Sequence, residues 1–222
     1  MEIFRSICLM LHIAAGFTAL VVGVFAFASS KGGKVHRFSG KIYVIAMLIV
    51  AFSSFILALI RYNPFLFMVG VFTLYMTVTG CRGLARKQKK QSPMLDWSLI
   101  VFSIIMAAYM LIKTFSLTGD TLEGFVPVVI VFAVTLFVFI IRDIQIYSGR
   151  VQMTANKWLL YHIGRISGAY IATFTAFLVT NIQTDPAYIA WLLPTVVGSF
   201  LIAYFQRKYK VKARKHTQEV RL

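Results

Sequence analysis

Residues 34–60 read KVHRFSGKIYVIAMLIVAFSSFILALI, a basic start followed by a long apolar run. A helix rises 1.5 Å per residue, so about 20 apolar residues cross the ~30 Å hydrocarbon core of a bilayer. Six other segments share this character. The predicted spans are 7–28, 38–60, 64–84, 97–117, 126–147, 158–181 and 186–206. We therefore expect an all-α protein, a bundle of seven transmembrane helices formed by residues 1–206.

The composition agrees with a membrane domain and leaves no room for a separate soluble one. The chain has 222 residues, of which 59% are hydrophobic and 14% are charged. A soluble domain carries about 25% charged residues. The chain has two cysteines, Cys8 and Cys81, and no CxxC motif. We expect them to stay unpaired, because they fall near opposite faces of the membrane.

The positive charges are distributed unequally about the spans. Of 23 Lys and Arg residues, only Arg5, Arg61 and Lys113 fall on the side of the N-terminus, and only Arg165 lies well inside a span. The positive-inside rule then places the N-terminus outside and the C-terminus in the cytoplasm of a bacterial cytoplasmic membrane. The net charge of +16 lies beside apolar spans, which favours an anionic inner leaflet over nucleic acid as the partner.

Two segments have alternative interpretations. The first span ends in Ala26-Phe27-Ala28, which resembles a signal-peptidase site. Its apolar run is longer than that of a signal peptide, so a retained helix is favoured. The basic cytoplasmic tail, residues 207–222, either lies on the anionic leaflet or is a solvated tail that only sets the topology.

Small residues recur at helical spacing in two spans. Such stripes let membrane helices approach closely, so packing is the favoured interpretation. The stripe of the first span contains Gly16, Ala19, Gly23 and Ala26, and that of the third contains Gly70, Thr73, Thr77 and Gly80.

Ionisable side chains gather near the cytoplasmic ends of three spans. They are His36, Arg37, Arg142, Asp143, His162 and Arg165. Polar groups inside a membrane are costly, so each needs a partner or a function. Arg165 is the deepest charge, and Asp143 is the acid placed to neutralise it, so we expect these two to pair. Arg37 and Arg142 can instead reach the headgroups with their long side chains.

Three kinds of site fit this cluster. His36 and His162 could be the axial ligands of a b-type haem, with Arg37 and Arg165 facing its propionates. Gly40 and Gly168 would then leave room for the ring. His36 and His162 could instead hold a divalent metal together with Asp143. The cations alone could bind an anion or a lipid headgroup, as in a transporter or an accessory protein. The substrate or redox partner is not indicated.

His12 stands apart from this cluster. It falls near the outer face, about 20 Å or more from the inner residues along a helix. No second outer histidine is available to complete another bis-histidine haem site.

Several short motifs resemble those of a known family. They are His12-x3-Gly16, His36-Arg37-x2-Gly40-x2-Tyr43, Tyr75-x3-Thr79-Gly80, His162-x2-Arg165 and Trp191-x2-Pro194-Thr195. Together they resemble a bacterial family of predicted polytopic membrane proteins of unknown function. In that family a methionine usually follows the arginine of the sixth span, where this chain has Ile166. The resemblance implies a helical membrane fold and supplies no activity.

Overall fold

The computed structural model describes residues 1–87, 93–116 and 126–219, and every regular element in these ranges is a helix. The helices are α1 (Glu2–Ala28), α2 (Lys34–Ile60), α3 (Pro64–Lys87), α4 (Pro93–Ser116), α5 (Val126–Tyr147), α6 (Ala155–Asn181) and α7 (Tyr188–Glu219). The predicted all-α membrane fold is confirmed.

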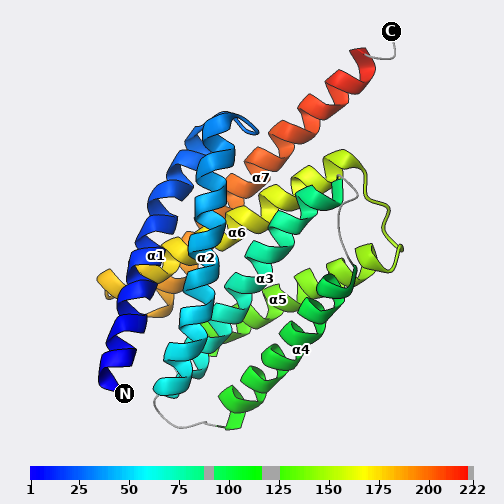
Figure 1. The fold of residues 1–222 in the computed structure, drawn as a ribbon. Coiled ribbons are helices and arrows are strands. Elements are labelled where there is room, and N and C mark those ends of the chain that lie inside the picture. Colours follow the sequence, from blue (N-terminus) through cyan, green and yellow to red (C-terminus); the bar gives the residue numbers. More distant parts are fainter. Residues whose placement is uncertain (88–92, 117–125, 220–222) are drawn as a thin grey trace.

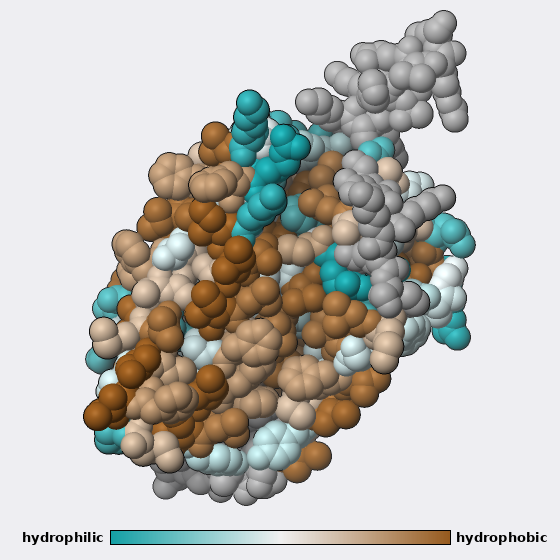
Figure 2. All heavy atoms as spheres, in the orientation of Figure 1, coloured by the Kyte–Doolittle hydropathy of each residue, from teal (hydrophilic) through white to brown (hydrophobic). Residues whose placement is uncertain are grey.

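Over the residues that the structure describes, six helices are long and apolar enough to cross a membrane, and α4 is not among them. In the described residues, the apolar part of α4 is the shorter stretch Met94–Tyr109. Hydrophobic side chains cover most of the face of the bundle that Figure 2 shows. Phe17, Ile45 and Phe200 are 64%, 60% and 73% exposed. Such a surface is stable only against lipid, so the protein is a multi-pass membrane protein.

Four of the helices form a bundle of their own (Figure 1). Helix α1 packs against α2 and α6, and α3 packs against the same two helices from the other side. Helices α2 and α6 are therefore diagonal, and no Cα atom of one lies within 8 Å of a Cα atom of the other, although both are described throughout. Helix α7 packs on α6, whereas α4 and α5 pack on α3 and on each other.

The small-residue stripes lie at the contacts between neighbouring helices, as predicted. Ala19 and Thr77 are fully buried. A Cβ atom added at Gly23 would clash with the ring of Tyr170, and one at Gly80 would lie 2.9 Å from Cβ of Arg165. The absence of side chains at these glycines is therefore what lets α1 and α3 approach α6 closely.

The bundle has two chemically different ends. We call the basic end the one that carries the α1–α2 turn, the α5–α6 turn and the C-terminal half of α7. Gly32 and Gly149 turn the chain there with φ of +80°, a conformation that favours glycine. Helix α7 does not stop at residue 206, where its apolar run ends, but continues to Glu219 and projects beyond the bundle (Figure 1).

The two cysteines are both free, as expected. Cys8 is buried in α1 and contacts the carbonyl oxygen of Ser53, with its sulfur 3.9 Å away. Cys81 lies in α3, six residues before that helix ends at the basic end. The two cysteines therefore lie in opposite halves of the membrane domain.

Candidate functional site

Two histidines at the basic end are bonded in the same way, each to the backbone of a neighbouring helix. Nδ1 of His36, near the start of α2, lies 2.9 Å from the carbonyl oxygen of Ala26 in α1. Nδ1 of His162 in α6 lies 2.9 Å from the carbonyl oxygen of Gly80 in α3. A carbonyl oxygen can only accept, so Nδ1 carries the hydrogen in both rings. In the neutral imidazole, the lone pair is then on Nε2.

Neither Nε2 atom has a hydrogen-bond partner among the residues that the structure describes. Both rings are half-buried. An oriented neutral imidazole with a free Nε2 is the form that binds a metal or a haem iron.

The two histidines also lie at the same depth on facing sides of α2 and α6. The hydroxyl oxygen of Thr173 in α6 lies 3.1 Å from the sulfur of Met47 in α2, which fixes the register of the two helices. His36 precedes Met47 by eleven residues, and His162 precedes Thr173 by eleven residues. Eleven residues are close to three full turns, about 16 Å. His36 therefore shares a helix face with Met47, and His162 shares one with Thr173.

The register therefore places His36 and His162 at the same depth, on the sides of α2 and α6 that face each other across the diagonal of the four-helix bundle.

One of the two glycines expected to make room beside the histidines does so. Around Gly40, one turn after His36, no described atom beyond its own stretch of helix lies within 4 Å of an added Cβ. At Gly168 the prediction is wrong. An added Cβ there would clash with Cε of Met76, so the space is already filled by that flexible side chain from α3.

Arg165 and Asp143 form the expected buried ion pair. Nη2 of Arg165 lies 2.8 Å from Oδ1 of Asp143, and their side chains are 4% and 0% exposed. The guanidinium also donates to the carbonyl oxygen of Phe139 at 3.1 Å and lies 4.1 Å from the centre of that ring. Protein groups thus neutralise and surround Arg165, which leaves its charge unavailable to a propionate or to another anion.

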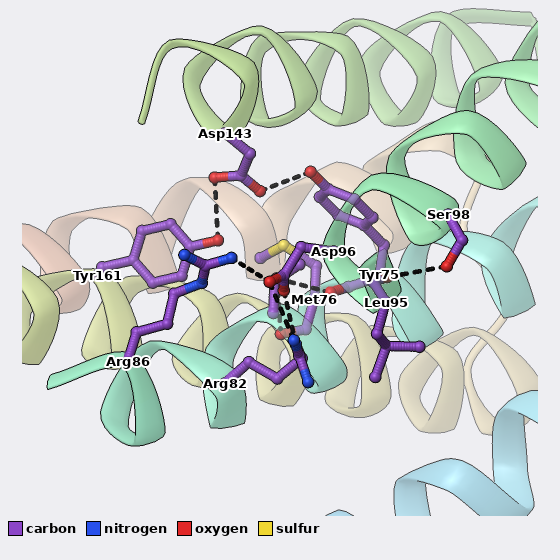
Figure 3. Close-up of polar contacts among 10 residues, drawn as sticks. Tyr75, Met76, Arg82, Arg86, Leu95, Asp96, Ser98, Asp143 and Tyr161 are labelled. Carbon is purple, nitrogen blue, oxygen red and sulfur yellow. Dashed lines mark hydrogen bonds and ion pairs between the residues drawn. The ribbon is translucent and has the colours of Figure 1, made fainter. Parts of the chain in front are cut away.

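Two tyrosines complete the coordination of this carboxylate (Figure 3). The hydroxyl of Tyr75 donates to Oδ2 of Asp143 at 2.5 Å, and that of Tyr161 donates to Oδ1 at 2.9 Å. Neither tyrosine was predicted as a partner of Asp143, although Tyr75 opens the Tyr75-x3-Thr79-Gly80 motif. For Tyr161 the signal is chemical, because a buried carboxylate needs more donors than a single guanidinium usually provides.

A second buried carboxylate, Asp96 at the start of α4, binds two arginines from the end of α3 (Figure 3). Arg82 donates from Nε to Oδ1 at 2.5 Å and from Nη2 to Oδ2 at 2.9 Å. Arg86 donates from Nη2 to Oδ2. This cluster was not predicted from the sequence, although the two arginines are four residues apart and so share a helix face.

The other predicted residues lie outside these contacts. Arg37 and Arg142 are exposed, as expected for side chains that reach the headgroups. His12 lies toward the opposite end, with Nδ1 2.9 Å from the hydroxyl oxygen of Ser53. That hydroxyl donates to the carbonyl oxygen of Ile49 at 2.6 Å, so His12 is the donor in its bond.

The structure does not bring His36, His162 and Asp143 together as three ligands. Across residues 1–87, 93–116 and 126–219, no group of three His, Cys, Asp or Glu side chains is placed to hold a metal ion. The two imidazoles remain as a pair, whereas the carboxylate is bound by Arg165, Tyr75 and Tyr161.

Comparison with known protein families gives a match over more than half of the chain. The model of a family described as "Predicted membrane protein (DUF2306)" matches residues 9–141. This segment contains His12 and His36 and ends before Asp143, His162 and Arg165. No curated protein and no solved structure matches the chain.

Proposed function

The chain belongs to the DUF2306 family of predicted membrane proteins, and we propose that it is a membrane redox protein that holds one b-type haem between His36 and His162. One observation carries the proposal. Two imidazoles on diagonal helices lie at equal depth, and each is oriented by a backbone carbonyl so that its Nε2 is free.

The surroundings support a flat ligand between these rings. Axial ligation requires two nitrogen atoms on opposite faces of the haem, which diagonal helices of a four-helix bundle can supply. Because α2 and α6 touch only through side chains, with no Cα atoms within 8 Å of each other, and because the space at Gly40 is open, a flat ligand has room between the helices. The bonds from Nδ1 to the carbonyls of Ala26 and Gly80 hold the ring planes and raise the basicity of Nε2.

Only one of the two arginines expected near the propionates remains available. Arg37 is exposed at the basic end, one residue after His36. When bound, the haem supplies one-electron transfer. The protein's part is to hold the ring and to fix the two imidazoles.

A spectrum of the purified protein tests the proposal. Protein from haem-replete cells should show a b-type spectrum after reduction with dithionite, and His36→Ala and His162→Ala should each abolish it. His12→Ala is the matched control, because His12 is also bonded through Nδ1 inside a membrane helix. Colourless wild-type protein, with no iron by elemental analysis, would exclude haem.

The same measurements also test the alternative ligand of this site, a divalent metal. A divalent metal bound by the two Nε2 atoms would appear in the elemental analysis without a haem spectrum. The transporter or accessory function, in which the cluster binds an anion, is less well supported. Its central cation would be Arg165, which Asp143 already neutralises.

We also propose that the basic end faces the cytoplasm and its anionic leaflet. The support is the charge distribution, with exposed side chains such as Lys34, Arg37 and Lys157 at that end. A fluorescent protein fused after Leu222 should be fluorescent, and alkaline phosphatase fused there should be inactive. An active phosphatase would reverse the assignment.

A further inference from the structure

The carbonyl oxygen that orients His36 accepts from a second strong donor. Nζ of Lys31, in the α1–α2 turn, lies 2.8 Å from the carbonyl oxygen of Ala26, and Nδ1 of His36 lies 2.9 Å from the same atom. The hydroxyl of Ser29 approaches this oxygen only to 3.5 Å. Two donors that share an acceptor at these distances lie less than about 6 Å apart, so a positive charge stands beside the His36 ring.

Helices α1 and α7 hold the Lys31 ammonium in this position. It also donates to the carbonyl oxygen of Phe27 at 2.7 Å, and so caps the last turn of α1. It lies 5.3 Å from the ring centre of Phe27 and 5.9 Å from that of Phe205 in α7. Because the side chain is partly buried, water screens its charge less than it screens the charge of an exposed lysine.

The ammonium acts on His36 in two ways that favour the same redox state of a ligated iron. Ferrous haem carries one positive charge less than ferric haem, so a nearby cation stabilises the ferrous form. A carbonyl oxygen that already binds an ammonium is also a poorer acceptor for Nδ1 of His36, which lowers the basicity of Nε2. A less basic ligand stabilises ferric iron less.

We propose that Lys31 is a positioning residue of the histidine site that raises its reduction potential, by placing a positive charge beside His36 and by competing for the carbonyl of Ala26. This role rests on the proposed haem ligation. The competition for the carbonyl, however, exists with or without haem. His162 is an internal reference, because its acceptor is the carbonyl of Gly80 in α3.

A redox titration of the haem spectrum tests this role. Lys31→Gln should lower the preference for ferrous over ferric haem roughly tenfold, which for one electron is a fall of about 59 mV in the midpoint potential. Lys31→Met should cause the same fall, and it keeps the apolar contacts with the two rings should the glutamine variant fold poorly. Lys31→Arg retains the charge and should keep most of the potential. Lys34→Gln removes an exposed lysine from the first turn of α2 and should change the potential several-fold less.

Nuclear magnetic resonance of haem-free protein with isotope-labelled histidine tests the shared carbonyl separately. Lys31→Gln should move the Nδ1 proton of His36 to lower field, because its hydrogen bond strengthens when the competing donor is removed, and the Nδ1 proton of His162 should not move. An unshifted His36 proton would overturn the proposal.

The failure of this role can be told apart from the failure of haem binding. Haem-loaded protein with the same potential in wild type, Lys31→Gln and Lys31→Met would overturn the role of Lys31 alone. An equal fall in Lys34→Gln would overturn it too, because the effect would then come from net charge. Colourless wild-type protein would overturn the proposed haem ligation and this role together.

Discussion

His162 and Arg165 lie one turn apart on α6, on the same side of the helix, but their side chains differ in how completely they are hydrogen-bonded. The guanidinium of Arg165 is bonded to Asp143 and to the carbonyl of Phe139, and its charge is balanced. The imidazole of His162 makes one bond through Nδ1 and leaves Nε2 free. We call the Arg165–Asp143 pair the closed site and the His36–His162 pair the open site. The two sites meet within one turn of α6.

The difference follows from the free energy that it costs to bury each group inside a membrane. A buried charge is tolerated only when an opposite charge and hydrogen bonds surround it, so an arginine at this depth has to be fully bonded. A neutral imidazole can leave one lone pair unused at a much smaller cost. Full bonding at Arg165 therefore indicates a structural role, whereas the open nitrogen at His162 is what supports the proposed haem ligation.

The largest effect on stability should come from breaking the closed site. Arg165→Gln and Asp143→Asn should each lower the free energy of unfolding by about 3–5 kcal/mol, because each leaves a buried charge unpaired. The double variant should lose less than the sum of the two. Thermal melting in detergent measures all three. Strictly additive losses would mean that the two side chains do not interact.

The next largest loss of stability should come from removing the tyrosine hydroxyls that donate to Asp143. Tyr75→Phe should cost about 1.5–3 kcal/mol, the range for hydrogen bonds to charged groups, and Tyr161→Phe should cost less because its bond is longer. Tyr170→Phe is the control, since its hydroxyl only reaches the carbonyl of Leu20 at 3.3 Å. Losses no larger than that of the control would show that Asp143 does not need these donors.

Glycine substitutions distinguish filled from open space. Gly23→Ala should cost about 1–3 kcal/mol, because its Cβ would strike the ring of Tyr170. Gly40→Ala should leave the free energy of unfolding unchanged or raise it by up to about 1 kcal/mol, because alanine favours helix and nothing is in the way. The same Gly40→Ala change should lower haem occupancy, measured by the reduced spectrum. Equal melting temperatures for the two variants would contradict this contrast.

The sequence predicts the closed site better than it predicts the open one. Asp143 is the acid that lies deep enough to balance Arg165, so charge and depth alone identify the pair. By contrast, Gly40 and Gly168 look alike in the sequence. Only the position of Met76 on a neighbouring helix separates the open glycine from the filled one.

The positions of the helix ends are also poorly predicted by the sequence. Residues 86–96 look like a basic surface loop, yet α4 already begins at Pro93, so that Asp96 enters its first turn and reaches Arg82 and Arg86. Helix α7 continues past its apolar run because Lys and Arg are good helix formers. Hydropathy records which residues prefer lipid, whereas these contacts depend on which helices are neighbours.

The smallest stability effect should come from the open site, and it is the sharpest test of the comparison. In protein prepared without haem, His36→Ala and His162→Ala should each cost only about 0.5–1.5 kcal/mol, because each loses one hydrogen bond to a carbonyl. Haem bound to the wild type should raise the melting temperature, since it binds only the folded state, and both variants should lose that increase. His12→Ala should keep it. If His162→Ala instead destabilised the haem-free protein as much as Arg165→Gln does, then His162 would belong to the closed site, and the distinction between a closed and an open site on α6 would fail.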